Sequence, residues 1–594
     1  MPAINHRFVL LATAFGVGGH FAQVLDAWRR RGPAIPTVPA AEDAQGPRAL
    51  AWQAAQALHY IAVLPALPPA AVLAVADLRA QWPVDVPGFH RLSLGDVTLD
   101  LLVGDIEPCL QQLQARVDAV YMPQAGVDLR TVARLALPGA QLAMHGADDG
   151  TLKALRSAGF TQQDCTYSWL GEADADAVCA EFTSRKPQPP RAAPPDRRAI
   201  VVGAGMAGAA ICERLAARGW DLTLIERHGL PAQEASGNRS GIFMPLLSRD
   251  DNIPTRLARA AYLYAQRRWC ALGGLHPEAP VGADVAGPIA GSQCGVLQLA
   301  RDAEHAALQR EVAAAWRYPE AYVRWVDAQQ AGAMLGVPVP HGGWLFPQGG
   351  WANPGSLCRA MLDACGARLA RIYHREAVTL LRAGGQWQVL DTQGQVLAQA
   401  PNVILANSAG AQSLAQTAQL PLYTMRGQVT HVDAQAFPNL PLVVCREAYI
   451  TPAVHGIVSA GATYDADKDA ALWPASQQEN LERAAEILPG ALDQLNLPLA
   501  GRVGFRCMVP DRLPLVGALP DYSAAGGKVE RLRDVPRHPG LYGLLAYASR
   551  GLIWAPLAAE ILAAQLENEP LPLETTLAAA LDPGRFFLKA LKKN

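Results

Sequence analysis

The sequence predicts an α/β protein in two parts, each with a mainly parallel sheet, and three observations support that prediction. Short apolar runs alternate with amphipathic helical stretches along both halves. Each half opens with an apolar strand that leads into a glycine-rich turn. Half of the 594 residues are hydrophobic and only 18% are charged, so the chain can build large cores and is neither disordered nor fibrous.

A proline-rich, basic segment separates the two parts. Residues 184–198 hold five prolines and five basic residues, a composition that cannot continue a helix or a strand. We therefore divide the chain into residues 1–182, a linker at 183–198 and residues 199–594. The net charge of −2 does not indicate a nucleic-acid partner, although the linker and the basic C-terminal tail supply local positive charge.

The composition also argues against several classes of protein. No run of about 18 uncharged apolar residues occurs, so we expect no membrane association. The ten cysteines form no CxxC pair, so we expect neither a disulfide framework nor a metal site and interpret them as scattered thiols of a cytoplasmic protein. The apolar run at residues 8–14 is a short signal-peptide candidate, but no cleavage site follows it, which favours a buried strand.

The strongest motif opens the C-terminal part. Four apolar residues at 199–202 precede Gly203, Gly205 and Gly208, and a helical stretch follows. Such glycines permit a tight turn, let the backbone approach a pyrophosphate, and let the helix pack on the strand, respectively. Glu226 ends the next strand, where its carboxylate can accept hydrogen bonds from ribose hydroxyls. The motif therefore indicates a dinucleotide cofactor.

Two features favour FAD over NAD. The glycine motif opens its domain at once, and a small-residue loop with Ser236, Gly237 and Asn238 follows the second strand, where backbone amides can approach a second part of a long cofactor. Near the other end of the chain, a strand meets a small-residue turn with Ser549 and Gly551, and then an apolar helix. The N-terminus of that helix would stabilise negative charge on a reduced flavin.

Further motifs make this part resemble a known family. In chain order they are Ser-Gly-Asn-Arg (236–239), Gly-Val-Leu-Gln-Leu (295–299), Gly-Trp-Ala-Asn-Pro (350–354), Pro-Leu-Tyr-Thr-Met-Arg-Gly-Gln-Val (421–429) and Ser-Arg-Gly-Leu (549–552). Together they resemble the flavin half of the MnmC family of bifunctional tRNA wobble-uridine modification enzymes, whose wider relatives are glycine, sarcosine and D-amino-acid oxidases. The resemblance implies an FAD-binding Rossmann-type domain interleaved with a sheet-rich substrate domain.

The resemblance also implies a reaction. FAD would oxidise 5-carboxymethylaminomethyl-(2-thio)uridine in tRNA to the 5-aminomethyl form, with the carboxymethyl arm leaving as glyoxylate. The implied partner is tRNA and not DNA, in the cytoplasm, and we expect a monomer. Because the arm ends in a carboxylate, a bidentate arginine is its natural anchor. By resemblance to glycine oxidases, Arg506 is the first candidate, Arg550 the second, and Tyr449 a hydrogen-bond partner of the same carboxylate; Arg426 either serves the pocket or orders its turn.

The N-terminal part resembles the Rossmann-like methyltransferase half of the same family. Its first strand runs into a glycine loop at residues 15–19, which suits a nucleoside such as S-adenosylmethionine. A later strand ends at Asp105, which could contact adenine. Trp82-Pro83 and the segments 87–92 and 134–140 recur in that half of the family.

Several departures from the family pattern lead us to expect weak or absent methyl transfer. Leu64 stands where the family has an acid for the ribose hydroxyls, and the active-site loop is shortened and has lost its acid at residues 121–124. The acidic entry to the glycine loop has become Ala14, and the family's leading segment is missing. The family implies S-adenosylmethionine, whereas these departures argue against its use. The alternative is a small-molecule glycine- or sarcosine-type amine oxidase with an inactive N-terminal binding module.

Overall fold

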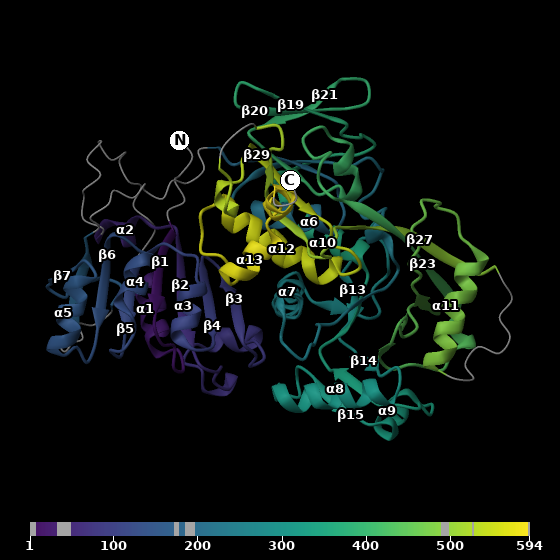
Figure 1. The fold of residues 1–594 in the computed structure, drawn as a ribbon, viewed down its shortest axis with the longest axis horizontal. Coiled ribbons are helices and arrows are strands. Elements are labelled where there is room, and N and C mark those ends of the chain that lie inside the picture. The colour runs from purple at the N-terminus through teal and green to yellow at the C-terminus, as the bar shows by residue number, and fades with distance from the viewer. Residues whose placement is uncertain are drawn as a thin grey trace. The chain divides into compact units, whose positions relative to one another are not determined.

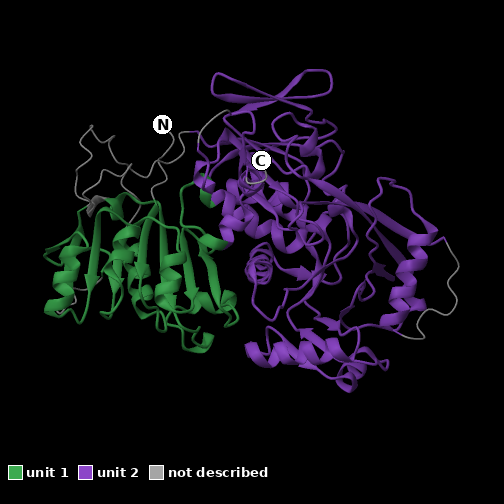
Figure 2. Ribbon diagram, in the orientation of Figure 1, with its two compact units in different colours: residues 1–195, 564–576 green, residues 196–563, 577–594 purple. Residues whose placement is uncertain are grey.

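The computed structural model describes residues 7–31, 49–170, 177–183, 196–488, 498–524 and 528–591. The chain forms two compact units: residues 1–195 with 564–576, and residues 196–563 with 577–594 (Figure 2). Most of the expected linker lies outside the described residues. The division differs from the expected one at residues 564–576, which the sequence assigns to the C-terminal part.

The first unit is built on an eight-stranded sheet in the order β3-β4-β2-β1-β5-β6-β8-β7 (Figure 1). The central strands β4, β2, β1, β5 and β6 are parallel, and the remaining three join antiparallel at the two edges. The strands are β1 (Arg7–Ala12), β2 (Ala57–Leu64), β3 (Gly88–Leu94), β4 (Val97–Val103), β5 (Val117–Met122), β6 (Ala136–Met144), β7 (Phe160–Gln163) and β8 (Val178–Phe182).

Helices cover both faces of this sheet. In β1, Phe8, Leu10 and Ala12 face one hydrophobic core, and Val9 and Leu11 face the other. Buried strands of this kind appear in a sequence as continuous apolar runs; the strand expected at residues 8–14 is present and covers Arg7–Ala12. The helices are α1 (Gly19–Arg30) and α2 (Ala49–Ala54) on the first face, and α3 (Ile106–Gln112), α4 (Leu129–Leu135) and α5 (Asp149–Ser157) on the second.

Residues 564–576 complete this unit, although they come from the far end of the chain. Glu569 forms an ion pair with Arg7 at 2.9 Å, and both side chains are largely buried. Arg91 donates a hydrogen bond of 2.7 Å to the carbonyl of Pro570. The segment therefore contributes buried polar contacts to the first unit and is part of its fold.

A disulfide corrects the expectation that all cysteines are scattered thiols. Cys165 and Cys179 are bonded, with 5.2 Å between their Cα atoms. Strand pairing explains the proximity, because Gln163 at the end of β7 lies opposite Cys179 in β8. Their separation of fourteen residues matches no short cysteine motif, so the sequence did not reveal the pair.

The second unit contains a six-stranded sheet in the order β18-β10-β9-β22-β29-β28, parallel except at β28. Its strands are β9 (Arg198–Val202), β10 (Asp221–Ile225), β18 (Leu369–Ile372), β22 (Asn402–Leu405), β28 (Leu515–Pro520) and β29 (Arg537–Leu545). The helices of this region are α6 (Met206–Ala216), α10 (Pro354–Asp363), α12 (Gly551–Leu566), α13 (Thr575–Leu581) and α14 (Gly584–Leu591). A hairpin sheet of β19 (Thr379–Ala383), β20 (Gln386–Leu390) and β21 (Val396–Ala400) shares a core with the parallel sheet.

A second region, rich in sheet, is interleaved with this one along the chain, as expected. An eight-stranded sheet has the order β15-β16-β14-β24-β25-β26-β23-β27, and a smaller one the order β11-β17-β13-β12. The strands of the larger are β14 (Val296–Leu299), β15 (Arg324–Val326), β16 (Gly343–Phe346), β23 (Tyr423–Asp433), β24 (Val443–Cys445), β25 (Tyr449–Ile450), β26 (Ile457–Gly461) and β27 (Ala500–Met508). The strands of the smaller sheet are β11 (Gly241–Phe243), β12 (Leu275–His276), β13 (Ile289–Ser292) and β17 (Gly350–Ala352). The helices of this region are α7 (Ile253–Ala271), α8 (Ala303–Trp316), α9 (Ala328–Leu335) and α11 (Pro474–Ile487). No helix in the described ranges is long and apolar enough to cross a membrane.

Candidate active site

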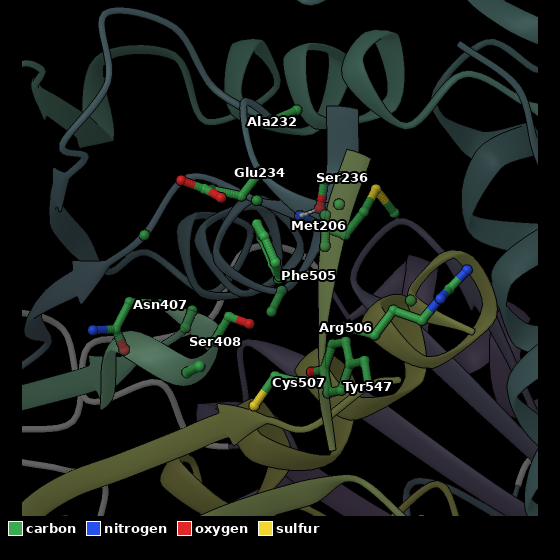
Figure 3. Close-up of a pocket in the computed structure, with 18 of the residues that line it drawn as sticks. Met206, Ala232, Glu234, Ser236, Asn407, Ser408, Phe505, Arg506, Cys507 and Tyr547 are labelled. Atoms are coloured by element: carbon green, nitrogen blue, oxygen red, sulfur yellow. Dashed lines mark hydrogen bonds between the residues drawn. The ribbon is translucent and has the colours of Figure 1, made fainter. Parts of the chain in front are cut away.

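A cavity of about 360 Å³ lies in the second unit, within the usual size range of small-molecule sites. The segments that line it come from distant parts of the sequence and include the turn after β9, the loop at 232–238, the loop at 406–413, strand β27 and the turn at 544–552 (Figure 3). Three of them follow the carboxyl ends of the parallel strands β9, β22 and β29, where open α/β sheets bind their ligands.

The glycine turn after β9 has no room for side chains. Gly203 has φ = 102°, and a Cβ there would lie 2.7 Å from the carbonyl oxygen of Ala406. A Cβ on Gly208 would overlap the carbonyl oxygen of Gly203, so this glycine lets α6 pack on the turn. Gly203 and Gly205 line the cavity, and the first turn of α6 begins beside them. The amides of a helix N-terminus can hold a phosphate there.

Glu226 follows β10 directly and lines the same cavity. Its carboxylate is buried and accepts hydrogen bonds from the backbone N–H groups of Ala204, at 2.8 Å, and His228, at 2.9 Å. These bonds fix the carboxylate at the carboxyl end of the second strand. Each oxygen keeps a further lone pair that can accept from a ribose hydroxyl.

The small-residue loop contributes two of its three candidates to the lining, Ser236 and Asn238. The Ser236 hydroxyl accepts a hydrogen bond of 3.1 Å from the N–H of Met206 at the start of α6 (Figure 3). Gly237 does not line the cavity, and a Cβ there would overlap the guanidinium of Arg502. The structure therefore gives Gly237 a packing reason for being glycine.

The turn before α12 brings Ser549 and Gly551 to the cavity, but Arg550 between them does not line it. Burial lowers the pKa of the Arg550 guanidinium, while nearby Cys445 and Tyr464 raise it. Arg550 thus lies next in sequence to two cavity residues but does not line the cavity itself.

Arg506 and Tyr449 meet in the cavity. Arg506, on β27, donates a hydrogen bond of 2.9 Å to the carbonyl of Thr463, and its guanidinium carbon lies 4.0 Å from the ring centre of Tyr464. Among the described residues no carboxylate pairs with Arg506. Burial raises the pKa of Tyr449 to about 12, and the Arg506 charge opposes that rise because the two groups are close. The cavity therefore offers a cation and a phenol hydroxyl to one anionic group.

Arg426, whose role the sequence left open, orders its surroundings. Its side chain is fully buried and donates to the carbonyls of Asp469, at 2.8 Å, and Ala471, at 2.6 Å. It also stacks on Trp473, with 3.8 Å between the guanidinium carbon and the ring centre. These contacts fix the segment between β26 and α11.

Two cavity residues that sequence reasoning missed bear on the cofactor. The side-chain oxygens of Asn407 and Tyr547 are buried, line the cavity and have no hydrogen-bond partner among the described residues (Figure 3). Buried polar atoms are rarely left so, because each costs free energy unless a ligand or water binds it. Together with the glycine turn and Glu226, these atoms fit a long polar cofactor such as FAD. The signal in the sequence was weak: each residue follows a parallel strand in a loop of small residues.

Comparison with known proteins identifies the family. The family model described as FAD dependent oxidoreductase matches residues 198–565. The tRNA 5-methylaminomethyl-2-thiouridine biosynthesis bifunctional protein MnmC of Paraburkholderia xenovorans is 39% identical over 611 residues, which cover 99% of this chain and 91% of that protein. The MnmC protein of Burkholderia thailandensis is 41% identical over 618 residues, with the same coverage. The chain belongs to the MnmC family. The resemblance stated from the sequence is therefore confirmed.

Solved structures with low identity share the fold of the oxidoreductase half of this MnmC family member. Glycine oxidase from Geobacillus kaustophilus matches with a TM-score of 0.54 and 21% identity, covering 66% of this chain and 99% of that one. L-Proline dehydrogenase from P. horikoshii matches with a TM-score of 0.52 and 17% identity, covering 66% and 98%. The expected FAD-binding fold is thus confirmed for the second unit.

A second family model, described as S-adenosyl-L-methionine-dependent methyltransferase, matches residues 71–124 of the first unit. The match begins after the glycine loop at residues 15–19. In that loop Gly18 is buried, whereas Gly16, Val17 and Gly19 are exposed. The Phe15 ring is buried over Gly18 and stacks on Trp82 with 5.8 Å between ring centres. The carbonyl of Val17 accepts a hydrogen bond of 2.9 Å from the N–H of Ala74.

The carboxyl end of β2 is equally apolar. Leu64 is buried in the same hydrophobic cluster as Phe15, and Asp105, beyond β4, is exposed. A leucine cannot accept the hydrogen bonds of ribose hydroxyls, and the Phe15 ring lies against Gly18 of the loop. Leu64 therefore does not fit the ribose hydroxyls of S-adenosylmethionine, although the family indicates that cofactor.

Proposed function

We propose that this MnmC family member oxidises the carboxymethylaminomethyl arm of the wobble (2-thio)uridine in tRNA, giving the 5-aminomethyl nucleoside and glyoxylate. One observation carries the proposal: Arg506 enters the flavin-type cavity beside Tyr449 and has no carboxylate partner among the described residues. An arginine that lines a cavity and has no carboxylate partner there is suited to bind the carboxylate of an N-substituted glycine. The bifunctional relatives are named for the biosynthesis of 5-methylaminomethyl-2-thiouridine in tRNA, which supports an arm at position 5 of a tRNA (2-thio)uridine.

Bound FAD supplies the hydride acceptor. Arg506 binds the substrate carboxylate and so orients the α-carbon, whose C–H bond is the one to break. Tyr449, whose pKa burial raises to about 12, is protonated at neutral pH like any tyrosine and donates a hydrogen bond to the same carboxylate. Loss of a hydride from the α-carbon leaves an iminium ion. Water then adds to that ion, and the C–N bond breaks to release the amine and glyoxylate.

The alternative, a small-molecule amine oxidase, uses the same cavity and differs in substrate. The purified holoenzyme is incubated with tRNA that carries the carboxymethylaminomethyl arm and, separately, with sarcosine and glycine. We expect glyoxylate and the aminomethyl nucleoside, detected by mass spectrometry of digested tRNA, at a kcat/KM far above that of either free amine. Turnover of sarcosine with no change in the tRNA would reject the proposal in favour of the alternative.

For the first unit we propose that methyl transfer is weak or absent. The buried Leu64, which cannot accept from ribose hydroxyls, supports this, because a methyltransferase must bind its cofactor before it can orient the methyl group against an amine. The test is calorimetric titration of S-adenosylmethionine, followed by transfer of a radiolabelled methyl group to aminomethyl-tRNA. Micromolar binding with multiple turnovers would contradict the proposal. Binding without turnover would place the defect in the loop at residues 121–124.

The proposal also covers the compartment, the partner and the oligomeric state. A tRNA-modifying enzyme works where tRNA is, so we place the reaction in the cytoplasm, with tRNA and not DNA as partner. We propose a monomer, which light scattering coupled to gel filtration tests directly. A mass twice that of the 63.2 kDa chain would contradict it.

A further inference from the structure

A motif that the proposed function does not use leads to a group of basic side chains. Arg239 ends the Ser-Gly-Asn-Arg motif at residues 236–239, Arg502 lies on β27 and His431 lies on β23. Val429 of β23 pairs with Arg502, so His431, two residues further along β23, is the diagonal neighbour of Arg502 on the same face of the two strands. Diagonal neighbours lie about 7–8 Å apart. These three residues form the basic cluster, and none of them lines the cavity.

Arg239 lies close to the other two members of the cluster. Its Nη2 donates a hydrogen bond of 3.2 Å to the carbonyl of Val454, in the turn between β25 and β26, and β26 pairs with β23. Burial lowers the pKa of His431, and the positive charges of Arg239 and Arg502 lower it further because both guanidinium groups are near the imidazole. Three basic groups therefore share one small region of the second unit.

No acid of the described residues pairs with either arginine. Arg502 donates to the backbone carbonyls of Gln233, at 2.6 Å, and Glu234, at 3.0 Å. Burial lowers the pKa of Arg502 and the charge of Glu234 raises it, but the Glu234 carboxylate pairs with Arg227 and His228. Two guanidinium charges that lie close together without a carboxylate repel each other, so an anion bound between them would stabilise both.

The cluster also keeps hydrogen-bond donors free. Nη1 of Arg239 and Nη1 of Arg502 have no partner among the described residues, and neither atom is buried. The ring nitrogens of His431 are in the same state. Nε of each arginine is buried and has no partner within the described part of the chain. Charged donors that reach the surface and lack partners are suited to bind the oxygens of a phosphate.

We propose that the basic cluster binds a phosphate group of the tRNA backbone while the carboxymethylaminomethyl arm lies in the cavity. The inference rests on the proposed function for the choice of tRNA as the source of the phosphate. Guanidinium groups bind phosphate oxygens through charge-assisted hydrogen bonds, and the phosphate charge would offset the repulsion between the two arginines. A site outside the cavity suits a part of the substrate that takes no part in the oxidation and that sarcosine and glycine lack.

The dimensions of a nucleotide are compatible with both contacts. Arg502 and Arg506 are four residues apart on β27, so their Cα atoms are about 13 Å apart at ~3.3 Å per residue. Twelve bonds join the carboxylate carbon of the arm to the 5′ phosphorus of the same nucleotide, at most about 18 Å at ~1.5 Å per bond. One nucleotide can therefore span the separation between the carboxylate anchor and the basic cluster.

The test compares Arg239→Gln and Arg502→Gln with the control Arg249→Gln. Glutamine removes the charge but keeps a donor for the backbone carbonyls, and Arg249 pairs with Glu311 outside the cluster. Each holoenzyme is titrated with a labelled anticodon stem-loop that lacks the arm, and binding is measured by fluorescence anisotropy at several salt concentrations. We expect Kd to rise roughly 10-fold or more in each cluster variant. The slope of log K against log salt should become shallower by about 0.7, as for one lost phosphate contact, whereas the control should match the wild type.

Flavin content and the binding of glycolate, followed by its effect on the flavin spectrum, separate a phosphate contact from damage to the active site. Both should equal the wild-type values in the two cluster variants. Loss of flavin in these variants alone would assign the cluster to the diphosphate of FAD, and an unchanged Kd and salt slope would mean that no phosphate binds there. Either result overturns the inference. Because the stem-loop lacks the arm, a wild-type enzyme that binds it through the cluster but leaves arm-carrying tRNA unchanged would reject the proposed function and support the phosphate site.

Discussion

Arg506→Lys tests the carboxylate anchor most directly. Nη1 of Arg506 already donates to the Thr463 carbonyl, and neither Nη2 nor Nε donates to a described residue, so these two nitrogens can bind both oxygens of a carboxylate. A lysine ammonium supplies the charge but not the two parallel bonds. Losing one charge-assisted hydrogen bond costs about 1.5–3 kcal/mol. At about 1.4 kcal/mol for each factor of ten, kcat/KM should fall roughly 10- to 150-fold.

The assay is anaerobic flavin reduction by tRNA that carries the arm, measured by stopped flow, together with the flavin content of each preparation. Arg446→Lys is the matched control, because Arg446 pairs with Glu486 and does not line the cavity. We expect full flavin content in both variants and slow reduction only in Arg506→Lys. Reduction at the wild-type rate in Arg506→Lys, with a loss in Arg550→Lys instead, would refute the assignment of the anchor.

Three further predictions concern the cofactor cradle and the stability of each unit. Gly208→Ala should lower the flavin content per chain, read from absorbance, because its Cβ would overlap the carbonyl oxygen of Gly203; full flavin content would contradict this. Arg426→Leu should lower the free energy of unfolding in urea by about 3–5 kcal/mol, because it leaves buried partners unpaired; a change below 1 kcal/mol would show that the segment relaxes. Burial lowers the pKa of His20 to about 3, so the unfolded chain binds a proton below pH 6.5 that the folded chain does not. The first unit should therefore lose stability as the pH falls from 6.5 toward 3, and His20→Phe, which can still stack on Tyr121, should flatten that dependence.

The elements that the sequence predicted best are those whose signal is local. Buried parallel strands such as β9 and β10 appear as short apolar runs, and their bounds agree with the expected ones to about a residue. The turn at Gly203 has a positive φ, which glycine adopts most easily. A glycine directly after an apolar strand therefore predicts this turn from the sequence alone. Membership of the family was equally accessible, because several motifs occur in a fixed order over the whole second part.

The features that the sequence did not predict are contacts between strands that are far apart along the chain. The cavity positions of Asn407 and Tyr547 require β22 and β29 to lie beside β9, and neither residue belongs to a motif. The packing of Gly237 under Arg502 depends on the course of β27. Strand order and register determine these contacts, and a single sequence carries little information about either.

The place of residues 564–576 has a consequence for synthesis. The first unit is made first on the ribosome, yet one of its segments follows about 380 residues after residue 183. At about 5–20 residues per second, translation takes on the order of 20 to 80 s to reach that segment. The ion pair of Glu569 with Arg7 and the bond of Arg91 to Pro570 form only after that interval. The nascent N-terminal unit therefore stays incomplete until nearly the whole oxidoreductase has been translated. A gene divided at the linker would produce a first half that lacks one segment of its own fold.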